Sequence, residues 1–154
     1  MNVENMTTLR DHLVWLRDNN RAYKFDMAAW LKVHDDYVPE NYYPIDTHQA
    51  SIRGLRNTLA DMGHTWGPSA TECGTVACLA GHAALLGGAP ERQPVLSFAQ
   101  HWLGLTSDEA FNLFFGRWHP SYPQSHGRPP KDVTIQDAID HLTGLLNAEA
   151  SPRA

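Results

Sequence analysis

Helix-start signals ahead of apolar runs constrain this fold more than any other feature of the sequence. Glu109 follows Thr106 at the spacing of a capping box, in which each side chain accepts a hydrogen bond from the backbone of the other residue. Thr134 and Asp137 repeat that spacing. Apolar residues three and four positions apart follow both starts, which predicts two amphipathic helices with one buried face each.

Similar patterns predict helices along most of the chain, and no alternating run typical of a strand is found. The predicted fold class is therefore all-α. The chain is expected to form one compact helical domain over residues 1–154, a bundle of about six or seven short helices, with 146–154 as a loose C-terminal tail. The predicted helices cover about 7–20, 26–31, 46–63, 73–86, 94–104, 106–116 and 134–146.

Two segments rich in proline and aromatic residues, 34–45 and 117–132, are predicted to be irregular because proline removes backbone donors. Tyr and Trp side chains in such loops are typical of interfaces. The alternative is that these rings fold back as lids over the helical core. The candidate interaction residues are Arg117, Trp118, His119 and Tyr122 in the second segment and Tyr42 and Tyr43 in the first.

The amino-acid composition and net charge exclude or disfavour some classes of binding partner for this chain. Hydrophobic residues make up 42% and charged residues 19%, which is neither a disordered nor a membrane composition. With 12 basic and 17 acidic residues the net charge is -5, so nucleic-acid binding is disfavoured. The start MNVENMTTLRDHLVWL has no signal-peptide or anchor pattern, which predicts a cytoplasmic protein with free thiols and no membrane partner.

The stretch ECGTVACLAGHA, residues 72–83, contains both cysteines and permits three interpretations. As a nucleophile, Cys73 would lie at the start of the predicted helix 73–86, where the helix dipole favours thiolate, with a histidine such as His82 as its base. As part of a metal site, Cys78 and His82 would share one helix face at i, i+4. Zinc needs three or four protein ligands, however, and no second pair with characteristic spacing is found.

The third interpretation of this stretch is packing. Most of its residues are small, which lets neighbouring backbones approach the helix closely, and glycine within a helix indicates a packing reason because it costs stability. Cysteine then serves as a small buried side chain. This interpretation explains more of the residues than the other two, and it predicts no metal and no cofactor.

The run CGTVACLAGHA is preceded by FDMAAWL and followed by LGLTSDEAFNLFF and WHP. In these motifs the chain resembles small uncharacterised proteins of bacteria and their phages that share a CGTxxCxxGxA core. The likeness covers roughly residues 20–120 and implies no particular activity.

The function predicted from these observations is a small protein-binding or regulatory module, phage or mobile-element encoded and acting on a host protein. The alternative is a cysteine-dependent enzyme that uses Cys73 with a histidine.

Overall fold

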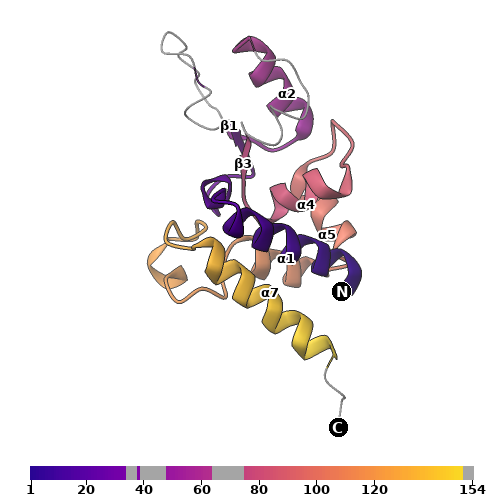
Figure 1. Cartoon of the computed structure of the whole chain (residues 1–154), viewed down its shortest axis with the longest axis vertical. Coiled ribbons are helices and arrows are strands. Elements are labelled where there is room, and N and C mark those ends of the chain that lie inside the picture. The colour runs from indigo at the N-terminus through magenta and orange to yellow at the C-terminus, as the bar shows by residue number, and fades with distance from the viewer. Residues whose placement is uncertain (34–37, 39–47, 64–74, 151–154) are drawn as a thin grey trace.

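The computed structural model describes residues 1–33, 38, 48–63 and 75–150, and this part of the chain is mainly α-helical (Figure 1). Its six α-helices are α1 (Val3–Asp18), α2 (Ile52–Asp61), α4 (Leu79–Gly87), α5 (Val95–Trp102), α6 (Ser107–Phe114) and α7 (Ile135–Ala150). Two short 3-10 helices are also present: η1 (Ala22–Lys24) follows α1, and η3 (Tyr122–Gln124) lies between α6 and α7. The described strands are β1 (Leu31–Val33), β2 (His48–Gln49) and β3 (Thr75–Ala77).

The strands form a small antiparallel sheet in the order β2-β1-β3, so the prediction of an all-α fold was wrong in this respect. The predicted helix over 26–31 is also absent. The Asp26 carboxylate accepts a hydrogen bond from the backbone N–H of Ala28 at 2.8 Å and closes a turn there. The backbone that follows pairs with residues distant in sequence, because the N–H of Cys78 donates to the carbonyl of Ala29 at 2.7 Å.

The two capping boxes start helices as predicted. Thr106 and Glu109 exchange both hydrogen bonds at the start of α6. At the start of α7 the Asp137 N–H donates to Thr134 Oγ1 at 3.1 Å, and the Thr134 N–H donates to Asp137 Oδ2 at 3.2 Å. These starts are local in sequence, so they depend little on the rest of the fold.

Other helix boundaries differ from the prediction. α1 begins at Val3 with Asn2 as its N-cap, before the expected Thr7 or Thr8. α2 begins after Ser51, whose hydroxyl accepts from the Gly54 N–H at 3.2 Å; the cap predicted at residue 46 lies outside the described residues. The last helix continues to Ala150, so residues 146–150 are helical rather than part of a loose tail.

The buried residues form two clusters, and α4 contributes to both. The larger, which we call the helical core, is built mainly by α1, α4, α5, α6 and α7, with α1 and α7 packed side by side (Figure 1). The smaller, the sheet core, joins β1, β3, α2 and the far side of α4. α4 gives Leu79, Ala80 and Ala83 to the helical core and Ala84 to the sheet core.

Candidate functional site

Cys78 is the N-cap of α4, so the helix expected to start near residue 73 begins only at Leu79. The side chain is 1% exposed, and burial raises the pKa of the thiol to about 11 even though the amides of Gly81 and Ala80 favour the thiolate. A thiol with this pKa is almost entirely protonated at neutral pH and is a poor nucleophile. Cys73, the nucleophile of the alternative enzyme interpretation, lies outside the described residues.

His82 lies in the first turn and a half of α4 and is 2% exposed. Its Nε2 donates a hydrogen bond to the Lys24 carbonyl at 2.8 Å, so in the neutral ring Nδ1 is the acceptor. Burial above all, together with nearby His12 and the charge of Lys24, lowers the pKa of His82 to about 3, although the hydrogen bond to the Lys24 carbonyl acts in the opposite direction. The ring is therefore neutral at pH 7 and is a weak base.

The metal alternative for Cys78 and His82 has no further ligands in the part of the chain that is described. There, no group of three or more His, Cys, Asp or Glu side chains is arranged to hold an ion. His82 Nε2 is moreover occupied by the Lys24 carbonyl. Two side chains do not make a zinc site, which needs at least three protein ligands.

The packing interpretation is confirmed at Gly81. A Cβ atom at this position would overlap the carbonyl oxygen of Trp30, which is backbone and cannot swing away. Cys78, Ala80, Ala83 and their small neighbours are buried as well. The small residues of α4 therefore bring this helix against the chain that enters β1, and the motif builds the centre of the fold.

Two predicted interaction residues of the 117–132 segment face the protein interior. The Trp118 ring packs against the helical core, stacks on His141 with centroids 4.3 Å apart, and donates from Nε1 to the Leu113 carbonyl at 3.1 Å. The His119 side chain is 13% exposed, with Nε2 2.9 Å from Asp137 Oδ2. These contacts hold the segment against α6 and α7, as the lid interpretation expects, and both residues are half-buried.

Arg117 and Tyr122 instead lie at the surface, beside an aromatic residue that the sequence analysis did not select. The Arg117 guanidinium carbon is 4.2 Å from the ring centroid of Phe111 and 5.8 Å from that of Tyr122. Phe111 is 38% exposed and stacks on Phe115 with centroids 4.3 Å apart. We call Phe111, Phe115, Arg117 and Tyr122 the aromatic–arginine surface.

The outward position of Phe111 could have been predicted from the sequence. It is adjacent to Ala110, and the capping box places Ala110, Leu113 and Phe114 on the buried face of α6, so Phe111 points outward. Phe111 is thus an exposed large apolar side chain that lies beside the Phe115 ring. Tyr42 and Tyr43, the other predicted interaction residues, lie outside the described residues.

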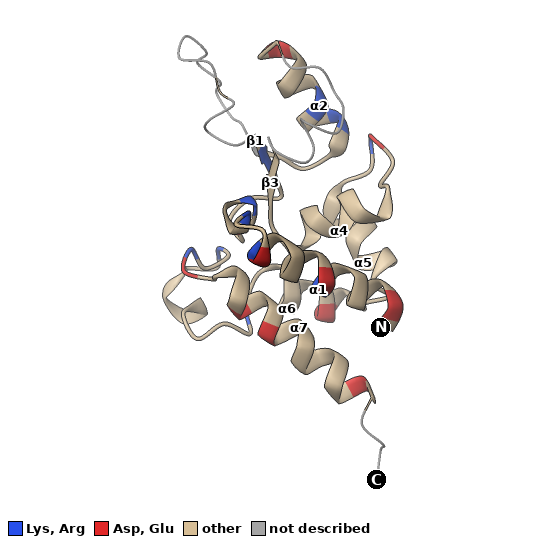
Figure 2. Ribbon diagram, in the orientation of Figure 1, with Lys and Arg blue, Asp and Glu red and all other residues tan. Residues whose placement is uncertain are grey.

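Charge is distributed unevenly around this surface. Figure 2 shows Asp and Glu along α1 and α7. The 117–132 segment carries Arg117, Arg128 and Lys131 against the single acid Asp132, all of them exposed. An acidic protein thus carries a locally basic segment, and Arg117 of this segment lies beside Phe111 and Tyr122.

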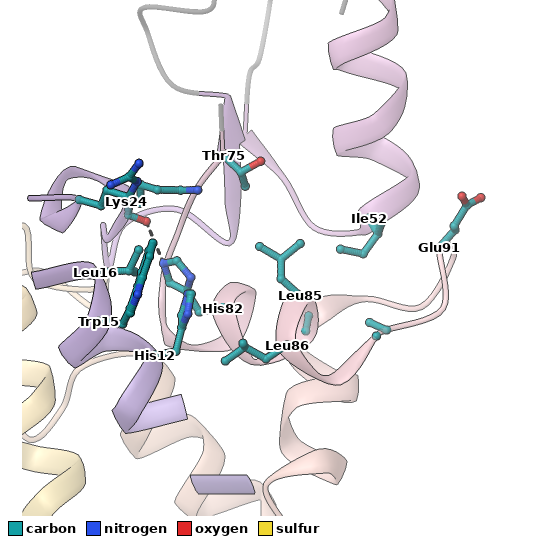
Figure 3. Close-up of a pocket in the computed structure, with 14 residues that line it drawn as sticks. His12, Trp15, Leu16, Lys24, Ile52, Thr75, His82, Leu85, Leu86 and Glu91 are labelled. Atoms are coloured by element: carbon teal, nitrogen blue, oxygen red, sulfur yellow. Dashed lines mark hydrogen bonds between the residues drawn. The ribbon is translucent and has the colours of Figure 1, made fainter. Parts of the chain in front are cut away.

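A cleft of about 750 Å³ lies between α1, η1, α4 and the start of α2 (Figure 3). Its volume is in the usual range for small-molecule sites. His82 connects this cleft to the ECGTVACLAGHA motif. The cleft was not predicted from the sequence because its residues come from separate segments of the chain. They are His12, Trp15, Leu16, Arg21, Lys24, Ile52, Thr75, His82, Ala84, Leu85, Leu86, Gly88, Ala89 and Glu91.

Comparisons with family models, curated proteins and solved structures give no match to this chain. Within the described ranges, no helix has both the length and the apolar character needed to cross a membrane.

Proposed function

We propose that this protein is a binding module for another protein and that the aromatic–arginine surface is its contact face. The observation that carries the proposal is the exposed Phe111 ring with the Arg117 guanidinium held over it at 4.2 Å. Aromatic and arginine side chains dominate the energetics of protein interfaces. Because Phe111 and Tyr122 already position the guanidinium, Arg117 loses little side-chain entropy when a partner binds.

The partner that best fits this face carries carboxylates beside an apolar side chain. Arg117 offers a planar fork of N–H donors that matches a carboxylate. In the same segment, a hollow of about 600 Å³ is lined by Arg128 and Lys131 together with the single acid Asp132, so two cations face one carboxylate there and a second acidic group is favoured. The opposite charges of the two faces would also speed their association.

A regulatory role on a host protein, in a phage or another mobile element, is the biological setting that we propose. It rests on the resemblance of residues 20–120 to small proteins of bacteria and their phages. A cytoplasmic location belongs to the same proposal, and the free thiol of Cys78 suits a reducing compartment.

The test is a quantitative comparison of surface variants with one purified partner. Proteins captured from the native cell are identified, and the stoichiometric one is purified for calorimetry with wild type, Phe111→Ala and Arg117→Ala. Each variant is expected to bind at least about thirtyfold more weakly, the loss typical of a hot-spot residue.

Tyr23→Ala is the matched control because Tyr23 is an exposed aromatic side chain, 47% accessible, outside the aromatic–arginine surface. It is expected to bind like the wild type. Equal binding by Phe111→Ala and the wild type would exclude this face, and capture of nucleic acid instead of protein would overturn the class of partner.

A further inference from the structure

The cleft between α1 and α4 has two chemically different ends. Figure 3 shows His12, Trp15, His82 and Lys24 together on the side of α1 and η1. Ile52, Leu85 and Leu86 lie on the side of α2 and α4. The first end offers nitrogen donors and an aromatic face, whereas the second is aliphatic. A cleft with this division suits a ligand that has a polar head and an apolar tail.

Arg21 supplies the positive charge at the polar end. Its guanidinium carbon is 5.5 Å from the Trp15 ring centroid, and its Nη1 donates to the Asn19 carbonyl at 3.1 Å. That bond uses one of five N–H groups. Within the described ranges no carboxylate forms an ion pair with Arg21, whereas Arg10 and Arg17 each pair with the aspartate that follows them. Arg21 is thus a half-buried cation with donors available to an anion.

The other polar residues of the cleft favour an anion there and not a second cation. His82 is neutral, and His12 lies beside it with ring centroids 5.2 Å apart. Burial and the positive charge of Lys24 lower the pKa of His12, which favours the neutral ring, so Arg21 is the cation on which the proposed site depends. The acid that lines the cleft, Glu91, extends at the far side in Figure 3 and is paired with Arg56.

We propose that this cleft binds a small amphipathic carboxylate with an unbranched aliphatic tail. The carboxylate accepts hydrogen bonds from Arg21, in the fork geometry that guanidinium and carboxylate groups share. The tail lies along Ile52, Leu85 and Leu86, where removal of its methylenes from water favours binding.

Decanoate is the probe for this site, and isothermal titration calorimetry measures its binding to the full chain. Decanol has the same tail without the charge, and acetate has the charge without the tail. Decanoate is expected to bind saturably at one site and at least tenfold more tightly than either. Failure of decanoate to bind, or equal binding of decanol, overturns the proposal.

Two variants locate the binding. Arg21→Gln is expected to weaken decanoate binding at least tenfold, whereas Arg17→Gln, which removes a neighbouring arginine outside the cleft, leaves it unchanged. Equal affinities in the two variants would place the carboxylate elsewhere. Leu86→Glu provides a second test if Arg21→Gln does not fold: Leu86 is 36% exposed, so the fold tolerates the change, but a carboxylate beside the tail abolishes binding.

This site is independent of the aromatic–arginine surface. Phe111→Ala, which is designed to weaken the protein contact, is expected to bind decanoate like the wild type. Each proposal therefore fails or stands on its own measurement.

Discussion

Replacing His82 with glutamine is expected to remove a large part of the acid sensitivity of this fold. Burial lowers the pKa of His82 to about 3, compared with about 6.5 for a histidine in the unfolded chain. Between these values the unfolded chain binds a proton that the folded protein does not bind. The stability that depends on the neutral ring is fully present above pH 6.5 and is lost as the pH falls toward 3.

The magnitude follows from the same two values. Within this window each pH unit lowers the free energy of unfolding by up to about 1.4 kcal/mol, so His82 alone accounts for about 2 to 3 kcal/mol between pH 7 and pH 4.5. Burial also lowers the pKa of His12 and of His141, and both act in the same direction. The variant removes only the share that belongs to His82.

Urea unfolding near pH 7 and near pH 4.5 measures this difference in wild type, His82→Gln and His101→Gln. Glutamine retains an N–H donor for the Lys24 carbonyl but does not titrate. His101 is exposed at the end of α5, and its replacement controls for the loss of a histidine. If His82→Gln loses as much stability on acidification as the wild type, the buried neutral imidazole is not the cause.

Three further outcomes are expected. Gly81→Ala forces a Cβ into the Trp30 carbonyl and should lower the free energy of unfolding by more than about 2 kcal/mol. Gly144→Ala, in open space on α7, should raise it by up to about 1 kcal/mol. Thermal melts that ranked the two variants in the other order would contradict the packing of α4. Trp118→Ala should lower the free energy of unfolding, measured by chemical denaturation, by about 3 kcal/mol and leave the partner affinity of the folded protein unchanged. A stable variant that binds the partner weakly would show that Trp118 belongs to the interface. Cys78 should resist a thiol reagent at pH 8 until the protein is unfolded, and rapid labelling of this residue in the native state would show that it is accessible.

Helices with both boundary signals in the local sequence were predicted well. α5, α6 and α7 begin at or beside Pro94, Thr106 and Thr134, as their patterns indicated. α4 ends at Gly87, followed by Gly88 in the left-handed conformation that favours glycine. Such signals act over one turn of helix, which is why a single sequence suffices to find them.

The sheet could not be predicted in the same way. β1 and β3 are three residues long, too short to show an alternating pattern, and each is stabilised by a partner far away in the chain. Residues 26–31 have apolar spacing compatible with a helix, yet pairing of this region with β3 and Cys78 satisfies its backbone instead. Tertiary hydrogen bonds here override a local preference.

The candidate sites also contain some features that follow from local sequence and others that depend on distant residues. The outward position of Phe111 follows from the capping box of α6, and in the segment predicted to be an interface Arg117 is exposed while Tyr122 is half-buried. The inward turn of Trp118 does not follow from the sequence, because it depends on His141 in a later helix. The cleft is assembled from segments far apart in the chain, so it could not be predicted from one motif, although Thr75 and His82 of its lining belong to ECGTVACLAGHA.

Because α1 packs beside α7, the helical core cannot finish folding on the ribosome until both helices have been synthesised. A ribosome produces α1 before α7, so the apolar face of Met6, Leu9, Leu13 and Leu16 lacks one of its main partners until α7 has been made. Exposed apolar faces of this kind make nascent chains prone to aggregation and attract chaperones. The helical core can therefore close only after translation has reached α7, although the sheet core, whose segments all precede it, is able to assemble earlier.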